Sequence, residues 1–386
     1  MNLPHITLIG HPYAPIGMGE QLRCHLAALR SVAVQPLVFD MFGFSSRSDR
    51  AHLDLVGSSE VAAPPPGIRI FHLNGDEVDN ARDAFARRGI AWDDGFNIIC
   101  PAWELPEYPA VWAEKLAGFD DIWAMSRFVR DSLREAGLES HVIPPSVQPA
   151  PGLRLPRRHF GISESAFVLL HFFDLTSYAS RKNPQAVLRL FQALTEADPY
   201  ADLQLVLKVK QGEADARAWA RDFLGAQAES GRVLLLDQAL DSLGVRSLIN
   251  ACDCFVSLHR AEGFGRGLGE AMALGRLALG TNWSGNTDFL NAETGVAVDY
   301  ELIPVAQGAY PHGEGQVWAD PSVEDAAQRL LELIRDPLQA RALARQGQAH
   351  ILQTHSNRAC GLEILARLKT HKSFFASFCS QKEDAV

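Results

Sequence analysis

The segment at residues 262–273 reads EGFGRGLGEAMA and lies between a short apolar run and a helical pattern of apolar residues. Its four glycines allow the backbone to approach a ligand closely and to point amides inward. The helix start behind them offers N–H groups to an anion, and the flanking Glu262 and Glu270 can accept hydrogen bonds from hydroxyl groups. The pattern predicts a ligand with phosphate and hydroxyl groups, such as a nucleotide sugar. An ordinary glycine-rich turn before an acidic helix start is the open alternative.

The sequence around this segment alternates between strand and helix patterns. Strands are expected over 167–173, 203–208, 233–236 and 254–258, and helices over 184–195, 214–226 and 242–250. After Val298 the pattern becomes almost wholly helical, with helices expected over 323–334, 338–353 and 358–369 before a last apolar stretch over 374–378. The alternation is typical of an α/β domain with a parallel sheet.

The first part of the chain repeats this architecture. Strands are expected over 5–9, 34–39, 68–73, 96–100, 121–124 and 141–143, and helices over 20–30 and 126–136. Four prolines between residues 144 and 151 mark the boundary. We therefore expect two domains, 1–150 and 151–370, with a cleft between the carboxyl ends of their strands and a C-terminal helix at about 370–386 that packs back on the first domain.

Composition excludes several classes of function. The chain has 386 residues, and its 36 basic and 46 acidic side chains give a net charge of −10, which argues against a nucleic-acid partner. The start lacks the pattern of a secretory signal, and no apolar run is long enough to span a membrane. We therefore expect a cytoplasmic protein. The six cysteines are sparse and are expected to be buried free thiols.

Several segments resemble the GT-B glycosyltransferases of family 4, whose E-x7-E pair falls on Glu262 and Glu270. The similar segments are GTNWSGNTDF at 280–289 and Asp299-Tyr300, together with AWELPEYP at 102–109, SRFV at 126–129 and RKNP at 181–184, which resemble a bacterial branch. The resemblance implies an α/β GT-B fold, in which two Rossmann-like parallel-sheet domains face each other across a cleft. It also implies a retaining transfer of a sugar from a nucleotide diphosphate to a hydroxyl group.

The resemblance further implies roles for the residues of the second domain. Glu262 would contact the donor sugar and Glu270 the nucleotide ribose. Further donor-binding candidates are Gly263, Phe264, Gly265, Leu268 and His259. Arg266-Gly267 stands where the family more often has Leu-Pro, and we expect Arg266 to point to solvent.

A basic pair, Arg181 and Lys182, lies in a predicted strand-to-helix connection before Pro184. An arginine fork and a lysine point charge suit a diphosphate and would stabilise it as a leaving group. The pair is therefore predicted to be catalytic, with a solvated basic turn as the alternative.

The first domain supplies the remaining candidates. Gly17 and Gly19 lie between the first strand and its helix without a full dinucleotide fingerprint, and the resemblance implies that they contact the donor diphosphate. Trp103 and Glu104 follow a strand, where the ring could cover a pyranose and the carboxylate could orient or deprotonate an acceptor hydroxyl. A core position for Trp103 and a surface ion pair for Glu104 are the alternatives. Asn74 is a further acceptor-binding candidate.

No Asp-x-Asp, His-Glu-x-x-His or Cys-x-x-Cys motif is present, so we expect no metal and no cofactor. The expected partners are a GDP- or UDP-linked sugar, with mannose favoured by resemblance, and a glycan or lipid-linked saccharide acceptor. The expected process is synthesis of a bacterial surface polysaccharide such as lipopolysaccharide, with the protein peripheral to the inner face of the plasma membrane. A nucleotide-sugar epimerase of the same fold and a non-catalytic nucleotide-sugar-binding protein stay open.

Overall fold

The computed structural model describes residues 4–43, 47–149, 154–174, 178–210 and 231–371. The helix expected over 214–226 and the apolar stretch over 374–378 lie outside these residues, as does nearly all of the helix expected at about 370–386.

The chain divides into two compact units. Unit 1 comprises Met1–Trp103, Glu107–Ser146 and Gln353–Val386, and unit 2 comprises Glu104–Pro106 and Val147–Leu352. The expected domain limits, 1–150 and 151–370, differ from this division mainly at the C-terminal side, because the chain returns to unit 1 from Gln353 onward.

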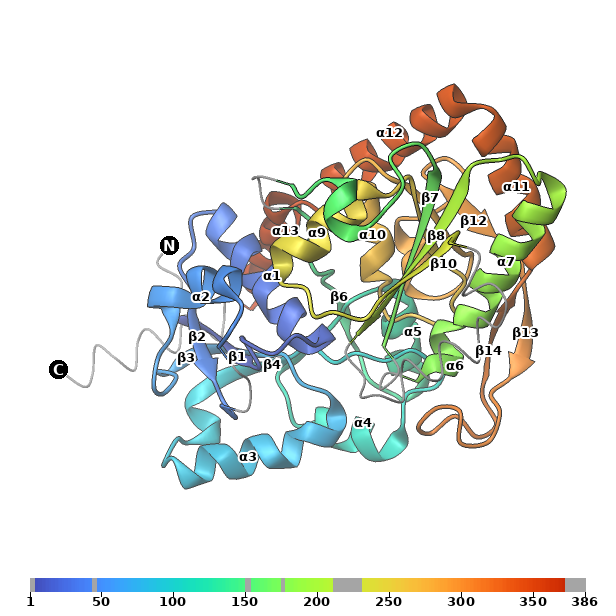
Figure 1. The fold of residues 1–386 in the computed structure, drawn as a ribbon. Helices are drawn as coiled ribbons and strands as arrows, with labels where there is room; N and C mark the ends of the chain where they lie inside the picture. Colours follow the sequence, from blue (N-terminus) through green and yellow to red (C-terminus); the bar gives the residue numbers. More distant parts are fainter. Residues whose placement is uncertain (1–3, 44–46, 150–153, 175–177, 211–230, 372–386) are drawn as a thin grey trace. The chain divides into compact units, whose positions relative to one another are not determined.

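Unit 1 is built on a parallel sheet of six described strands (Figure 1). These are β1 (Ile6–Gly10), β2 (Leu37–Asp40), β3 (Gly67–Phe71), β4 (Gly95–Ile99), β5 (Asp121–Ala124) and β6 (His141–Val142). Their order across the sheet is β2-β1-β3-β4-β5-β6. Each strand overlaps one of the predicted apolar runs.

The helices of unit 1 include one from the far end of the sequence. They are α1 (Gly17–Ser31), α2 (Arg50–Val56), α3 (Val78–Arg87), α4 (Ala110–Leu116), α5 (Arg127–Glu135) and α13 (Asn357–Thr370). Apolar residues of α1, α13 and the strands share one core. Helix α13 packs closely against α1 (Figure 1). The helices approach so closely that a Cβ atom on Gly361 would lie 2.3 Å from the carbonyl oxygen of Ala28.

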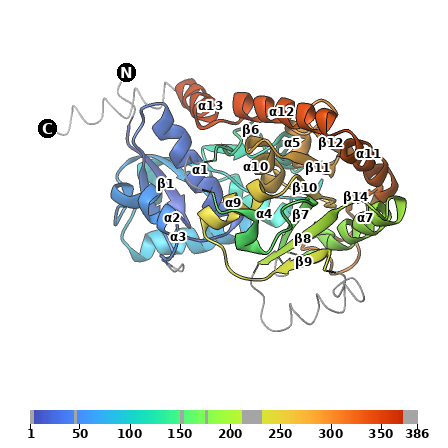
Figure 2. The same cartoon turned by 45° about the horizontal axis from the view of Figure 1, so that its top comes forward.

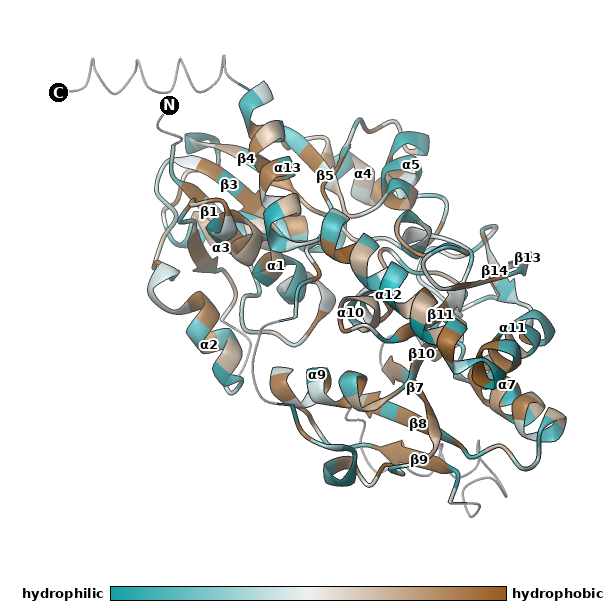
Figure 3. Cartoon of the chain, turned by 90° about the horizontal axis from the view of Figure 1, so that it is seen from above, coloured by the Kyte–Doolittle hydropathy of each residue, from teal (hydrophilic) through white to brown (hydrophobic). Residues whose placement is uncertain are grey.

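Unit 2 has a second parallel sheet of six described strands, ordered β12-β11-β10-β7-β8-β9. The strands are β7 (Phe167–Asp174), β8 (Leu203–Lys210), β9 (Val233–Leu236), β10 (Cys254–Ser257), β11 (Leu277–Thr281) and β12 (Val296–Val298). Figure 3 shows that β7, β8 and β9 are mainly hydrophobic. Continuous apolar runs of this kind are typical of parallel strands that are covered on both faces.

The described helices of unit 2 are α6 (Ala179–Lys182), α7 (Pro184–Ala197), α9 (Ser242–Ala251), α10 (Arg266–Ala273), α11 (Val323–Arg335) and α12 (Pro337–Thr354). Helices α7 and α11 pack side by side (Figure 1, Figure 2). Short 3-10 turns lie at Gly57–Ser59, Gly75–Glu77, Trp92–Asp94, Arg157–Phe160 and Gly285–Asp288. Within the described residues, no helix is both long and apolar enough to cross a bilayer.

The two parallel sheets confirm the predicted α/β class. The expectation that the chain is almost wholly helical after Val298 is wrong, however, because β13 (Tyr300–Pro304) and β14 (Val317–Pro321) pair as an antiparallel hairpin. Each strand has five residues and includes a charged residue and a proline, YELIP in β13 and VWADP in β14, so neither strand presents the apolar run by which a strand is recognised from sequence. The five cysteines that the structure describes are free and buried, as expected.

Strand order reverses once in each sheet. In unit 1 the reversal lies between β1 and β3, and in unit 2 between β7 and β10. Chains leave neighbouring parallel strands in opposite directions at such a point, which opens a crevice at the carboxyl ends of the strands. These two places are therefore where each unit is best shaped to bind a ligand.

The carboxylate of Asp121, at the start of β5, fastens α13 to unit 1. Arg367 donates to it from Nε at 2.8 Å and from Nη2 at 2.9 Å, and Trp123 Nε1 donates at 2.8 Å. Burial alone raises the pKa of this carboxyl group, but the hydrogen bonds from Arg367 and Trp123 outweigh burial and hold the pKa below its usual range.

We expect Asp121→Asn to lower the free energy of unfolding by about 3–5 kcal/mol at neutral pH, because the Arg367 guanidinium loses its buried counter-charge. The folded-state pKa of Asp121 lies below the unfolded value of about 3.9. Its carboxylate therefore stabilises the fold above that pH and ceases to do so as the pH falls through the folded-state pKa. Urea unfolding of both proteins across the acidic range measures this difference.

The matched control is Asp131→Asn, whose side chain is 45% exposed and pairs with Arg130 at 2.8 Å. An exposed pair of this kind contributes less than about 1 kcal/mol. Equal losses in the two variants, or a loss from Asp121→Asn that persists in acid, would contradict the expectation.

Candidate active site

The best-defined charged cluster of unit 2 lies at its strand reversal. Arg181 and Lys182 belong to α6, which follows β7, and Glu262 lies on the chain that leaves β10. Because β7 and β10 are neighbours, their outgoing segments meet at the same edge of the sheet. The structure thus brings together three of the four residues predicted to be catalytic.

Both carboxylate oxygens of Glu262 are engaged. Lys182 Nζ forms an ion pair and hydrogen bond with Oε1, and Arg181 Nη1 lies 3.3 Å from Oε2. Arg181 is 4% exposed and Glu262 is 9% exposed, so this is a largely buried ion triad. Lys182 is the most accessible member, with 23% of its side chain exposed.

The mutual charges shift the pKa values of all three groups. Burial alone raises the pKa of Glu262, but Lys182 and Arg181 outweigh burial and bring it to about 2. Burial lowers the pKa of Lys182 more than the Glu262 carboxylate raises it. Burial also disfavours the charged form of Arg181, but the carboxylates of Glu262 and Glu104 outweigh that effect and raise its pKa. Glu262 is therefore ionised throughout the physiological pH range.

Backbone hydrogen bonds fix the triad in place. Arg181 Nη1 donates to the carbonyl of Ala261 at 2.8 Å, and the carbonyl of Arg181 accepts from the amide of Arg260 at 2.8 Å. The amide of Glu262 donates to Ser284 Oγ at 2.8 Å, and its carbonyl accepts from the amide of Gly285 at 2.9 Å. Glu262 is thereby tied to the segment that follows β11.

His259 has a packing role in this arrangement. Its Nδ1 lies 3.0 Å from the carbonyl of Ser257 and its Nε2 lies 2.9 Å from Asn286 Oδ1, and the residue is fully buried. Burial lowers its pKa, so the ring is neutral at pH 7. These hydrogen bonds hold the ring in place, and its predicted contact with the donor stays a prediction.

Packing within the protein explains why two positions of the 262–273 segment are glycine. Gly265 has a φ of +88° before α10, and a Cβ atom there would lie 2.8 Å from Asn286 Cβ. A Cβ atom on Gly267 would lie 2.5 Å from the ring of Phe255. Close packing therefore requires glycine at these two positions, whereas the sequence analysis related all four glycines to a ligand.

The remaining donor candidates lie on α10 and just before it. Glu270 pairs with Arg266 Nε at 2.8 Å, so Arg266 is directed along the helix instead of freely into solvent. Phe264 is 5% exposed and packs on Phe289 with ring centroids 5.1 Å apart. Leu268 is 1% exposed, so its side chain belongs to the core.

Glu104 groups with unit 2, unlike its neighbour Trp103. Its carboxylate accepts a hydrogen bond from the hydroxyl of Tyr310, a residue of the β13–β14 connection. Tyr310 was not predicted as a site residue, because the hairpin that carries it was not predicted either.

In unit 1, Trp103 is 2% exposed, and its Nε1 donates to the carbonyl of Glu107 at 2.7 Å. Its ring meets Trp112 edge-on at 5.4 Å. The ring therefore lies in the core, which is the alternative that the sequence left open for Trp103. Asn74 Oδ1 accepts from the amide of Ala102 at 3.0 Å, so this side chain joins the ends of β3 and β4.

Gly17 and Gly19 lie in the first turn of α1 and differ in their surroundings. A Cβ atom on Gly19 would lie 2.5 Å from the carbonyl oxygens of His11 and Ala14, so packing of the helix start against the preceding loop requires glycine. Gly17 is exposed and has no atom within 4 Å of such a Cβ, so it leaves room beside the helix start.

Sequence reasoning missed a polar pair at the strand reversal of unit 1. His11 Nε2 lies 2.8 Å from Glu77 Oε1, and the ring of His11 stacks on Phe42 with centroids 4.9 Å apart. The other oxygen of Glu77 accepts from the amide of Asn74 at 2.9 Å. His11 and Glu77 are 66 positions apart, so no local motif could have paired them.

Among the described residues, one group has the composition of a metal site. It comprises His25, His72 and Cys100 of unit 1, whose potential ligand atoms lie within 4.8 Å of one another. His25 Nδ1 and His72 Nε2 are 3.0 Å apart. Burial lowers the pKa of His25 to about 4 and also lowers the pKa of His72. Both rings are therefore neutral at pH 7, and one N–H···N hydrogen bond joins them.

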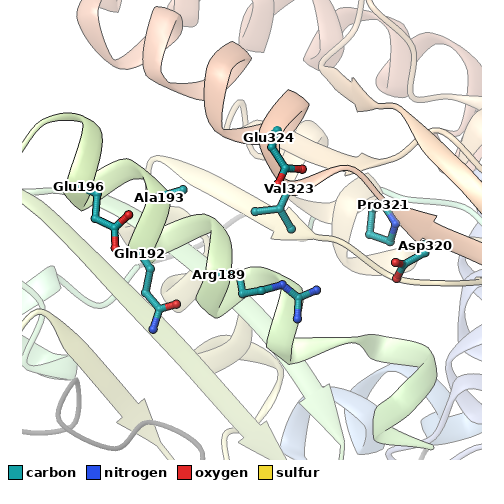
Figure 4. Close-up of a pocket in the computed structure, with 8 residues that line it drawn as sticks. All are labelled: Arg189, Gln192, Ala193, Glu196, Asp320, Pro321, Val323 and Glu324. Atoms are coloured by element: carbon teal, nitrogen blue, oxygen red, sulfur yellow. The ribbon is translucent and has the colours of Figure 1, made fainter.

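A surface hollow of about 390 Å³ lies between α7 and the start of α11 (Figure 4). It is lined by charges of both signs, including Arg189, Glu196, Asp320 and Glu324. No member of the Glu262 triad lines it, so the hollow is separate from the candidate site.

Part of the chain matches a known protein family. Residues 168–336 match the family model described as Glycosyl transferases group 1, and this range contains Arg181, Lys182, Glu262 and Glu270. No curated protein sequence matches the chain.

Solved structures share the fold at low sequence identity. HepE from Anabaena, solved in complex with UDP and glucose, is 16% identical with a TM-score of 0.67 over 95% of this chain and 100% of that chain. Sucrose-phosphate synthase from Thermosynechococcus elongatus is 15% identical with a TM-score of 0.67 over 96% and 99% of the two chains. A glycosyltransferase from Rickettsia africae is 14% identical with a TM-score of 0.66 over 96% and 99%.

Each of the two units has a Rossmann-like parallel sheet, and the chain shares the GT-B fold of these solved structures. The family match itself lies in residues 168–336, within unit 2. The GT-B fold that the resemblance implied is therefore confirmed.

We expect Gly285→Ala to disturb the triad directly, because the added Cβ would lie 2.0 Å from the carbonyl oxygen of Gly263 and 2.8 Å from the amide of Phe264. These are backbone atoms, so the loop behind Glu262 has to move. The variant should lose at least about 2 kcal/mol of stability, measured by thermal unfolding. Gly118→Ala is the control, since its closest neighbour is the flexible end of Arg82 at 2.8 Å. An unchanged melting temperature for Gly285→Ala would show that this contact does not constrain the loop.

Proposed function

We propose that the protein is a retaining glycosyltransferase that moves a sugar from a nucleotide diphosphate to a hydroxyl group of a saccharide acceptor. The observation that carries this proposal is the buried triad of Glu262, Arg181 and Lys182 at the strand reversal of unit 2. It lies within the residues that match the glycosyl transferase family. The triad has one more positive charge than negative, which favours an anionic group such as a diphosphate beside it.

The proposed reaction breaks the bond between the anomeric carbon and the phosphate oxygen, and the electron pair leaves with the diphosphate. The acceptor oxygen forms the new bond from the same face, and its proton passes to the departing phosphate. Arg181 and Lys182 stabilise the negative charge that grows on this phosphate. Fixed cations in a buried site stabilise such charge better than water does, because they need no reorganisation.

In this proposal Glu262 positions the donor sugar and does not attack it. Both of its oxygens are held by cations, and a carboxylate with a pKa near 2 is a weak base. A double displacement would instead need a carboxylate free to bond the anomeric carbon. The ionic contacts therefore favour front-face transfer over a covalent intermediate.

The proposal also names a donor and an acceptor. The structure of HepE in complex with UDP and glucose supports a nucleotide sugar as donor, and we include GDP-mannose among the donors to be tested. Glu104 is proposed to orient the acceptor hydroxyl, and a glycan or lipid-linked saccharide of a surface polysaccharide is the proposed acceptor.

Glu262→Gln should lower turnover of a nucleotide sugar by about 100-fold or more, because the amide cannot hold the donor sugar with a charged acceptor group. Nucleotide diphosphate binding should stay the same or become tighter, since both cations lose their internal counter-charge. Donor turnover is measured by released nucleotide diphosphate and affinity by calorimetry with UDP and GDP. Glu301→Gln, on the exposed side of β13, is the matched control. Turnover by Glu262→Gln at the wild-type rate would reject the proposed role.

A second experiment tests the stereochemistry and the absence of a metal together. NMR of the product, formed with a chelator present, should show the donor's anomeric configuration at an undiminished rate, because the cationic side chains neutralise the leaving group. An inverted anomer would exclude front-face transfer, and loss of the rate with chelator would mean that a metal ion carries the diphosphate.

A further inference from the structure

The connection between β13 and β14 brings Tyr310 onto the cationic pair. The ring centroid of Tyr310 lies 5.9 Å from the guanidinium carbon of Arg181, which is the range of a cation–π contact. The ring of Tyr178 meets the Tyr310 ring at a centroid distance of 4.9 Å. Arg181 is therefore enclosed by the Glu262 carboxylate and by an aromatic ring.

The hydroxyl of Tyr310 acts on a different group. It donates a hydrogen bond to the carboxylate of Glu104, the residue proposed to orient the acceptor. Burial and the Glu104 carboxylate both raise the pKa of Tyr310, so the hydroxyl keeps its proton at any physiological pH and can only donate to a carboxylate. One side chain thus contacts a cation on the donor side of the site and a carboxylate on the acceptor side.

The hairpin itself is fastened to the site by Arg260. The Arg260 carbonyl accepts from the amide of Ala319 at 3.0 Å, and Nη2 donates to Asp320 Oδ1 at 3.1 Å. Its Nη1 donates to the carbonyl of Ser180 at 2.7 Å. Arg260 therefore links β14 to α6, the helix that carries Arg181 and Lys182.

A second contact holds the loop closer to its tip. Ser180 Oγ donates to the carbonyl of Ala309 at 3.1 Å, directly before Tyr310. A Cβ atom on Gly313 would lie 2.7 Å from Val305 Cγ1 and 3.0 Å from the carbonyl oxygen of Tyr310, so the loop closes tightly on itself. The position of the Tyr310 ring is thus determined by α6 and by the fold of the loop.

We propose that Tyr310 is a positioning residue of the transfer site, whose ring keeps Arg181 directed at the donor phosphate and whose hydroxyl fixes Glu104 for the acceptor hydroxyl. This inference rests on the proposed function. It assigns the β13–β14 hairpin a part in the reaction, and it separates the two roles of one side chain into a ring effect and a hydroxyl effect.

The two roles give different kinetic signatures. Tyr310→Phe keeps the ring and removes the hydroxyl, so it should lower kcat by about 10- to 100-fold, the range for loss of a hydrogen bond to a charged group. Its affinity for UDP or GDP should stay within about twofold of wild type, because Arg181 keeps its aromatic neighbour. Tyr310→Ala should in addition weaken nucleotide affinity by about 3- to 30-fold.

A double-mutant cycle isolates the hydroxyl effect. If the hydroxyl acts through Glu104, Tyr310→Phe should cause no further loss of kcat in a protein that already carries Glu104→Ala, which removes the acceptor of this hydrogen bond. A merely structural role for Tyr310 would instead give losses that multiply, because destabilisation of the loop does not depend on the side chain at position 104.

Tyr200→Phe is the matched control, since it makes the same chemical change at a residue that is 98% exposed and lies outside the site. Wild-type turnover by Tyr310→Phe, or multiplicative losses in the cycle, would overturn this inference and leave the proposed function intact. If the wild-type protein neither binds nor turns over any nucleotide sugar, the proposed function fails and this inference fails with it.

Discussion

The ion triad of Glu262, Arg181 and Lys182 constrains the rest of unit 2. A carboxylate buried without partners costs several kcal/mol, and so does each buried cation. The segments after β7 and β10 therefore have to meet for either to be stable. The close approach of Gly285 to Gly263 and the hydrogen bond from Glu262 to Ser284 bring the segment after β11 into the same structure. Unit 2 is therefore stable only when the three charged side chains are placed against one another.

The segments that carry the triad meet at the strand reversal of unit 2, and the β13–β14 hairpin lies beside them. A parallel sheet brings many segments to one edge, but only at the reversal do neighbouring segments leave space for a ligand. In this protein the β13–β14 hairpin extends the edge with a short antiparallel pair that is joined to α6 through Arg260. Arg181 is thus contacted by two segments that are distant from it in the sequence, the chain after β10 and the β13–β14 connection.

The sequence predicted the strands of both sheets well, because they depend on local patterns of apolar residues. Apolar runs mark buried parallel strands, and Arg181, Lys182 and Glu262 stand where two of these runs end. The reason for glycine at position 267 could not be predicted, since the ring of Phe255 that excludes a side chain there lies on strand β10 and meets it only in the folded protein. The core position of Trp103 likewise depends on packing, here against the ring of Trp112. Tyr310 was missed because each strand of its hairpin is recognisable only with its partner in place.

The return of the chain to unit 1 has a consequence for biosynthesis. Helix α13 completes the core of unit 1, yet about 200 residues of unit 2 are translated before it. At common elongation rates of about 5–20 residues per second, synthesis of α13 follows that of the first part of unit 1 by roughly 10–40 s. During that interval the surface of α1 that later receives Gly361 stays uncovered, whereas unit 2 emerges in almost one continuous piece. On the ribosome, the part of the protein that begins the sequence is therefore the last to reach its final form.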